Sequence, residues 1–380
     1  MAFGLNLRFI RSGIFLAFLL FIISGNSYYI SVPLNSSDYF EMCWMNIDPK
    51  DPTLALNSTN PNYVYPVTAS FIAGFVTAIQ CIGGTILNLL VILAIFRSTD
   101  LRKEYLTPSI MSIAVTDLMF SIYMMPIMAF TYFTRDNPLT KGCEFYGFSG
   151  FGLCICSIFN LVSLAILRCV AVYFPRKTKS LVFQRSCIIL PIMTWVSTVL
   201  LLLPTLFRQY GRFGLECGSF RCELMNIGTD LMLVTPRQFW AVLLGLNGLL
   251  LFPLNAGTYY QVSKQSRRIL EQIKDLNLDA GQYGFLEKER KLGKMIALIT
   301  LSFFGVYSPV MIILMIDENA NTKLPVPFLV TQVIFCSLVI IDPMVYIVSH
   351  EKYREGIKLL FKPIFLRARE IGDEKDTTIK

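Results

Sequence analysis

Long apolar runs alternate with short polar segments along most of this chain. A bilayer has a hydrocarbon core about 30 Å thick, which a helix of about 20 residues crosses. Seven runs are long enough, and their residues lack the strict alternation of a barrel strand, so each is predicted to be a membrane-spanning helix. The predicted spans are 68–96, 106–133, 141–174, 181–207, 235–264, 290–316 and 325–349. The fold class is therefore an all-α membrane protein, a bundle of seven transmembrane helices over 68–349.

The residues before the first span divide into two parts. Arg8 and Arg11 precede an apolar stretch that ends at Ile23, with small and polar residues after it. This order is typical of a signal peptide, predicted here over 1–26, and the stretch is short for a span. An additional N-terminal helix is the alternative. The polar segment 27–67 contains glycosylation sequons at Asn35 and Asn57, which predict a glycosylated extracellular segment.

Residues 350–380, after the last span, are predicted to be a cytoplasmic helix and tail. Between Glu351 and Phe361, apolar residues recur at helical spacing with Lys and Arg between them. That pattern favours a short amphipathic eighth helix lying on the membrane surface. The end of the chain is acidic and polar, which is typical of disorder.

Composition and charge support a membrane protein and set its direction. Hydrophobic residues make up 54% of the chain and charged residues 16%, against about 25% charged in soluble domains. Four segments, 97–105, 174–185, 264–294 and 350–380, hold 23 Lys and Arg, against eight in the mature segments on the other side. The positive-inside rule then places the N-terminus outside, in agreement with the sequons. The net charge of +8 indicates contact with membrane lipids, not nucleic acid, because the basic residues form no dense stripe.

Among the ionisable residues inside the predicted spans, three stand out: Asp117, Arg168 and Asp342. Such groups are costly in lipid and usually functional, although each could simply pair with a neighbouring helix and hold the bundle together. Pro343, like prolines in the fifth and sixth spans, removes a backbone donor and loosens its helix where a hinge would be needed. These features favour a bundle that changes conformation.

The order of polar and proline landmarks, one or more per span, resembles the pattern of rhodopsin-like (class A) G-protein-coupled receptors. The landmarks are Asn88, Asp117, Arg168, Trp195, Pro253, Pro309 and the motif Asp342-Pro343-x-x-Tyr346. Within that family, the stretches Leu106–Phe133 and Gly211–Leu224 look most similar to the invertebrate moody and trapped-in-endoderm receptors. The resemblance implies a plasma-membrane receptor in which an outer ligand shifts helices five and six and thereby activates a heterotrimeric G-protein.

The resemblance also implies roles for individual residues. Cys143 would form the family's outer disulfide with Cys222, Cys217 being the alternative. Arg168 would hold the closed state through Glu289, because a guanidinium can donate two parallel hydrogen bonds to one carboxylate. Equally, Glu289 could be a solvated residue in a run of charges. The expected activation switch comprises Arg168, Glu289, Tyr307, Pro309, Asp342, Pro343 and Tyr346.

The chain departs from the family pattern at several of these positions. The usual Asp-Arg-Tyr triplet is Leu167-Arg168-Cys169, so Arg168 lacks its adjacent carboxylate. Raised basal activity is therefore a hypothesis. Tyr307 stands two residues before Pro309 where the family has tryptophan, and Gln261 stands where a tyrosine is typical.

The polar residues of the core allow two interpretations. Asn88, Asp117, Ser157 and Asp342 together offer hard oxygen ligands for a sodium ion. Two carboxylates in one small pocket can equally share a proton. The sequence does not choose between them, and no other cofactor or metal is expected.

The class of ligand is limited mainly by residues that the sequence lacks. The seventh span has no lysine, which excludes a retinal Schiff base, and Gly150 stands eighteen residues before Arg168, where amine receptors have aspartate. The outer halves of the spans are rich in Phe, Met and Tyr, which favours a lipid or other apolar ligand, although lipid-facing helices show the same residues. The predicted pocket residues are Tyr123, Met124, Phe151, Phe239, Tyr307 and Met311.

Other function classes fit the sequence less well. His350 is the only histidine, which argues against His-based catalysis and zinc sites, and no phosphate-binding glycine loop is visible. Asp117 and Asp342 match an intramembrane aspartyl protease by number, but lack the glycine-rich contexts expected. The chain is therefore predicted not to be an enzyme. A receptor-like protein that binds without signalling, or a transporter or channel, remains the alternative.

Overall fold

A computed structural model describes residues 67–134, 138–139, 142–207, 209, 211–216, 221–225, 236–276, 298, 301–302, 304–313 and 325–361. Several predictions therefore lie outside the described residues. These are the signal peptide (1–26), the sequons at Asn35 and Asn57, the predicted Arg168 partner Glu289, the alternative disulfide cysteine Cys217 and the chain after 361.

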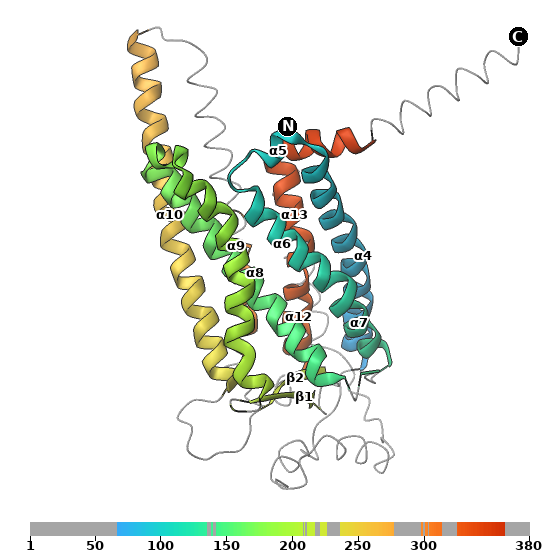
Figure 1. The fold of residues 1–380 in the computed structure, drawn as a ribbon. Coiled ribbons are helices and arrows are strands. Elements are labelled where there is room, and N and C mark those ends of the chain that lie inside the picture. Colours follow the sequence, from blue (N-terminus) through green and yellow to red (C-terminus); the bar gives the residue numbers. More distant parts are fainter. Residues whose placement is uncertain are drawn as a thin grey trace, which may run out of the picture.

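The described residues form a bundle of long helices that run side by side (Figure 1). The long helices are α4 (Val67–Arg97), α6 (Thr107–Met119) continued by η1 (Phe120–Met124) and α7 (Met125–Thr134), α8 (Cys143–Tyr173), α9 (Leu181–Leu206), α10 (Pro236–Leu276), and α12 (Pro325–Cys336) with α13 (Leu338–Ser349). Residues 304–313 and 351–361 are also helical. The prediction of an all-α bundle is confirmed. Helix α10 continues beyond the end of the fifth predicted span at 264, to Leu276.

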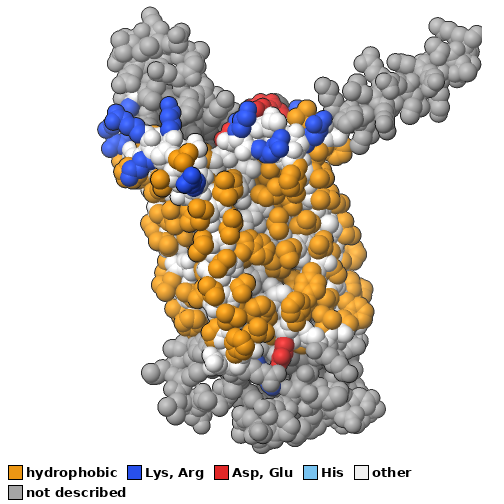
Figure 2. All heavy atoms as spheres, viewed as in Figure 1, with side chains coloured by type: hydrophobic (Ala, Val, Ile, Leu, Met, Phe, Trp, Pro, Cys, Tyr) orange, Lys and Arg blue, Asp and Glu red, His pale blue; other side chains and the backbone are white. Residues whose placement is uncertain are grey.

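The outer surface of the bundle is apolar. Five of the described helices are long and apolar enough to cross a membrane, and Phe304–Ile313 is a shorter apolar helix. Phe71, Phe75 and Ile82 on α4 are each at least 60% exposed, which would be unfavourable in water but suits contact with lipid chains. On the face that Figure 2 draws, hydrophobic side chains form a broad band across the middle of the molecule.

The two ends of the bundle differ in charge and structure. Lys and Arg gather at the end formed by α5 (Thr99–Arg102), the 3-10 helix Pro175–Lys179 and helix 351–361, called the basic end here (Figure 2). The opposite end carries a two-stranded antiparallel hairpin of β1 (Arg212–Glu216) and β2 (Arg221–Met225), and is called the hairpin end (Figure 1).

The hairpin is fixed to the bundle by a covalent bond and by packing. Cys222 of β2 forms a disulfide with Cys143, the first residue of α8, with 5.2 Å between their Cα atoms. This is the predicted pairing. Phe213 of β1 packs against Gly147 of α8, where a Cβ would lie only 2.7 Å from the phenylalanine ring. The hairpin therefore covers the bundle at the hairpin end.

The second span contains a π-helical turn that the sequence analysis did not predict. Over Phe120–Met124 the helix widens, and the N–H of Met125 bonds to the carbonyl of Phe120. Pro126 follows directly, and a proline ring collides with the carbonyl four residues earlier in a regular α-helix. The wider turn relieves that collision, and it rotates the rest of the span.

Three helices meet closely around Gly84. The amide of Asn88 donates to the carbonyl of Gly84 at 2.9 Å and to that of Val339 on α13 at 2.8 Å. A Cβ on Gly84 would lie 2.6 Å both from Oγ of Ser121 and from a methyl of Val339. Glycine therefore allows the approach on which the Asn88 bridge depends.

Replacing Gly84 with alanine should destabilise the bundle, because the added methyl group overpacks the contact of three helices, at a cost of about 1–3 kcal/mol. The measurement is the thermal unfolding midpoint of the purified protein. Gly245→Ala on α10 is the control, since a Cβ there meets nothing within 4 Å. Equal midpoints for the two variants would contradict this account of the contact.

Candidate functional site

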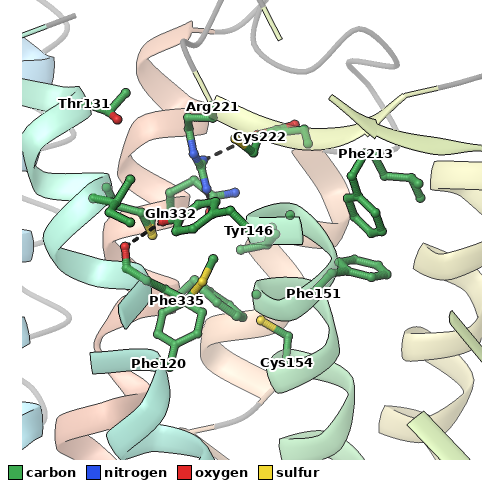
Figure 3. A pocket seen from close by; sticks show the side chains of 18 of the residues that line it. Phe120, Thr131, Tyr146, Phe151, Cys154, Phe213, Arg221, Cys222, Gln332 and Phe335 are labelled. Carbon is green, nitrogen blue, oxygen red and sulfur yellow. Dashed lines mark hydrogen bonds and ion pairs between the residues drawn. The ribbon is translucent and has the colours of Figure 1, made fainter. Parts of the chain in front are cut away.

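A cavity of about 180 Å³ lies beneath the hairpin, between the helices. Figure 3 shows that its lining comes from the second span, α8, both strands and α12. Helix 304–313 and α10 complete it, through Tyr307, Val310, Met311 and Trp240. The cavity is thus built by segments that are far apart in the sequence.

Most of the lining is aromatic or sulfur-containing. The ring of Phe151 packs edge-on against Trp240 at 5.4 Å and lies 5.9 Å from Phe213, while Tyr307 packs edge-on against Phe335 at 5.2 Å. Such pairs hold the rings in fixed orientations. The cavity therefore suits a ligand that is mainly apolar.

The structure brings four of the six predicted pocket residues into this lining: Met124, Phe151, Tyr307 and Met311. The other two, Tyr123 and Phe239, do not line this cavity. Tyr123 is half-buried beside the lining, with its ring 5.6 Å from that of Tyr146. Phe239 is 41% exposed on the outside of α10, because its neighbour Trp240 occupies the inward-facing position and successive helical residues point about 100° apart.

Arg221 is the most informative lining residue that the sequence analysis missed. It extends from β2 toward α12, where its Nη2 donates to Oε1 of Gln332 at 3.3 Å (Figure 3). Its position directly before Cys222 was the available signal, because a disulfide to α8 holds that part of the loop over the bundle. A single basic residue in a loop otherwise gives no sign that it points inward.

Gly150 lies on the cavity wall beside Met124. A Cβ at this position would collide with the methyl end of Met124. Methionine thus fills the space next to α8, and no carboxylate is present there to bind an amine.

The predicted polar core lies deeper in the bundle. Asn88, Asp117 and Asp342 are buried, with exposures of 0%, 6% and 2%, and the two carboxylates interact electrostatically. One oxygen of each carboxylate has no hydrogen-bond partner among the described residues. Ser157 is half-buried on α8. No group of three or more His, Cys, Asp or Glu suited to a metal occurs within the part of the chain that the structure describes.

Arg168 lies fully buried near the basic end of α8. Its Nη1 donates to the hydroxyl of Tyr105 at 3.1 Å, and the Tyr105 ring packs against Phe183 of α9 at 5.6 Å. The sequence analysis did not single out Tyr105, because it lies in the short segment before α6, where an aromatic residue is unremarkable.

The switch residues of the seventh span are placed together. Pro343 and Tyr346 are buried in α13, and the Tyr346 ring lies 6.2 Å from that of Tyr353 in helix 351–361. An ion pair between Lys352 and Glu104 ties the same helix to the segment before α6. Pro309 lies half-buried in helix 304–313. On α9, Trp195 donates to Oγ of Ser112 at 2.9 Å, which joins that helix to α6.

A helical bundle with a covered cavity at one end, a carboxylate pair in its middle and a buried arginine at the other end is the architecture of a seven-helix receptor. The chain matches the family described as "7 transmembrane receptor (rhodopsin family)" over residues 87–346. It therefore belongs to the rhodopsin family of seven-transmembrane receptors. This is a receptor class, so the chain is not an enzyme.

Known relatives and structures agree with this assignment. The chain is 21% identical to "Protein trapped in endoderm-1" of Drosophila melanogaster over 343 residues, which cover 86% of this chain and 84% of that protein. It is 26% identical to "Melanopsin-like" of Danio rerio over 82% of this chain, but spans only 62% of that protein. The crystal structure of squid rhodopsin shares the fold, with a TM-score of 0.65 and 23% identity over 83% of this chain and 93% of the other.

These findings confirm a class A receptor related to the trapped-in-endoderm group, with the predicted seven-helix fold. Helices α12 and α13, which form the seventh span, contain no lysine.

His350 is the only histidine of the chain, so its pKa can be measured without overlap from other imidazoles. Burial lowers its pKa below the usual 6.5, and the nearby cations Lys352, Arg354 and Arg168 act in the same direction, whereas Glu104 opposes them. The unfolded chain should therefore bind this proton at a higher pH than the folded chain. His350 should consequently favour unfolding as the pH falls through 6.5.

The measurement is the pH titration of the single imidazole signal in the NMR spectrum of histidine-labelled protein. The midpoint should lie below 6.5, the usual value, and Glu104→Gln should lower it further. A wild-type midpoint at or above the usual value would contradict burial of the ring.

Proposed function

We propose that this chain is a plasma-membrane receptor that converts binding of a compact, largely apolar ligand into G-protein activation. The observation that carries the proposal is the lining of the cavity, which includes residues of both α10 and helix 304–313. A ligand there touches the fifth and sixth helices directly, and membership of the rhodopsin family implies coupling to a heterotrimeric G-protein.

The proposed orientation places the hairpin end outside the cell and the basic end inside. Lys and Arg at α5, the 3-10 helix and helix 351–361 support this direction through the positive-inside rule. The disulfide of the hairpin supports it as well, since such bonds persist in the oxidising outer compartment. The ligand would then enter from outside, and the G-protein would bind at the basic end.

Activation would proceed through movement of the fifth and sixth helices. Pro253 lies inside α10 and Pro309 inside helix 304–313, where each frees a carbonyl and permits bending. Phe252 and Phe304 pack edge-on at 6.2 Å, so the two helices are in contact and would move together. A ligand drives this shift only to the extent that it binds the open state more tightly than the closed state.

The resting restraint on Arg168 would include the hydroxyl of Tyr105. In the triplet Leu167-Arg168-Cys169 the residue before the arginine is not a carboxylate, and Tyr105 offers an oxygen acceptor to the guanidinium within the bundle. Glu289 is retained as a second proposed partner, although it lies outside the described residues.

In the polar core, either a sodium ion or one shared proton would compensate the two buried carboxylates of Asp117 and Asp342. Two like charges in a site of low dielectric cannot both stay ionised without compensation. The carboxylate oxygens without partners among the described residues fit both interpretations. Each would link the core to Asn88, which already joins α4 and α13.

A receptor-like protein that binds without signalling is the second candidate. The altered triplet Leu167-Arg168-Cys169 favours it, because the usual carboxylate beside the arginine is replaced by leucine. The signalling assay below separates the two candidates.

Basal G-protein dissociation should be measurable for the wild-type chain in cells, across a panel of Gα subunits at matched surface expression. Glu289→Ala should raise the signal, because it removes a proposed restraint on Arg168, and Arg168→Ala should lower it, because Arg168 is a proposed G-protein coupling residue. If no Gα responds to any variant, a non-signalling binder or a strictly ligand-gated receptor would be favoured.

Tyr105→Phe should raise basal activity by about tenfold, since a hydrogen bond to a charged group contributes about 1.5–3 kcal/mol and would be lost only from the closed state. The ring that packs on Phe183 is kept, so folding should be little affected. Tyr260→Phe on α10, where the side chain is 65% exposed, is the control. Unchanged basal activity in Tyr105→Phe would show that this hydroxyl is no restraint.

A further inference from the structure

We propose that the ligand of the cavity is a compact amphiphile whose oxyanion head, a carboxylate or phosphate, pairs with Arg221. The inference rests on the proposed function, because it takes the cavity beneath the hairpin as the ligand site. It adds the charge and the size of the ligand, which the apolar lining alone does not define.

The backbone at Arg221 is held in place at the mouth of the cavity. In the antiparallel register of the hairpin, the backbone of Arg221 lies opposite that of Glu216. The next residue, Cys222, forms the disulfide with Cys143 of α8. The side chain of Arg221 is only 16% exposed and extends from β2 into the lining (Figure 3). An arginine positioned in this way cannot easily swing out into water, so its charge stays at the cavity.

The guanidinium has more donors than acceptors around it. Nη2 donates to Gln332, and Cζ lies 5.5 Å from the centre of the Phe328 ring. Nη1 has no hydrogen-bond partner among the described residues. It lies 3.6 Å from Oε1 of Glu223, beyond the 2.7–3.2 Å range typical of N–H···O bonds. A guanidinium has five N–H groups, so the described residues use only part of the donor capacity of Arg221.

Among the described residues that line the cavity, Glu223 is the only other charged one. Gln332 and Phe328, both on α12, hold the guanidinium across the cavity, and a guanidinium binds oxyanions through charge-assisted hydrogen bonds. An ammonium head would instead have to approach Glu223 beside the positive Arg221. The arrangement therefore favours an anion over a cation.

The volume limits the apolar part of the ligand. A cavity of about 180 Å³ is similar in size to an apolar cavity of ~150 Å³ that holds a benzene-sized molecule. Below Arg221, Met124, Phe151 and Phe335 provide apolar walls. A chain of about eight carbons is therefore a suitable probe, whereas a long-chain lipid would need the bundle to open.

The test measures binding of four probes with the same eight-carbon chain to the full-length protein in nanodiscs. They are octanoate, octyl phosphate, octan-1-ol and octylamine, whose heads are two oxyanions, a neutral group and a cation. Octanoate or octyl phosphate should bind roughly tenfold or more tightly than octanol, because charge-assisted bonds in a desolvated site are strong.

Two variants of the same ion pair provide the matched comparison. Arg221→Gln should remove the preference for oxyanions over octanol, whereas Glu223→Gln should keep or increase that preference, because a competing carboxylate is removed. Both variants break the contact between Arg221 and Glu223, so loss of the pair alone cannot explain opposite results. Arg221→Lys, which keeps the charge without the fork, should retain part of the preference and reports on folding.

The outcomes separate this inference from the proposed function. Octanol binding as tightly as octanoate and octyl phosphate, octylamine binding best, or no binding of either oxyanion would overturn the inference. In the first two cases a ligand site in the cavity would still stand. Oxyanion binding that depends on Arg221 but activates no Gα would instead retain the inference and contradict the signalling proposal.

Discussion

The hydrocarbon core of a bilayer offers no hydrogen-bond partners, and this constraint shapes the whole bundle. Side chains of Asn88, Trp195 and Gln80 bond across helices instead, to Val339, Ser112 and Val333. Apolar residues such as Phe71 can face outward, because lipid does not penalise them. Among the described residues, the buried polar atoms without a hydrogen-bond partner include one oxygen each of Asp117 and Asp342 and Nη1 of Arg221.

Helix α8 connects the regions where these groups lie. Its first residue, Cys143, fixes the hairpin over the cavity, its middle forms a wall of that cavity through Gly150 and Phe151, and Arg168 lies near its other end. Its packing against α9 and α10 makes it a central element of the bundle. A change in the cavity need not travel along α8 itself, because α10 and helix 304–313 touch the ligand site and extend toward the basic end.

The relationship to opsins and to the trapped-in-endoderm protein shows how one fold accommodates different ligands. The chain shares 26% identity with a melanopsin-like protein, yet its seventh span lacks the lysine on which a retinal Schiff base depends. At the cavity, Met124 fills the space beside Gly150, and Arg221 brings a positive charge from the hairpin. The cavity lining thus carries features particular to this chain, while the landmarks that shape the bundle stay recognisable.

The sequence by itself determined the all-α bundle, because hydropathy runs are local signals. The resemblance to the receptor family implied the Cys143–Cys222 pairing and left Cys217 as the alternative, and the structure has the first of these. The sequence also identified Asp117, Arg168 and Asp342, since ionisable residues stand out within apolar runs. The π turn at Phe120–Met124 depends on how Pro126 is accommodated, and the outward placement of Phe239 depends on the rotation of α10. Only the tertiary structure brought Arg221 to Gln332 and Tyr105 to Arg168, because these contacts join residues 111 and 63 positions apart, and no local pattern encodes which loop folds over which helix.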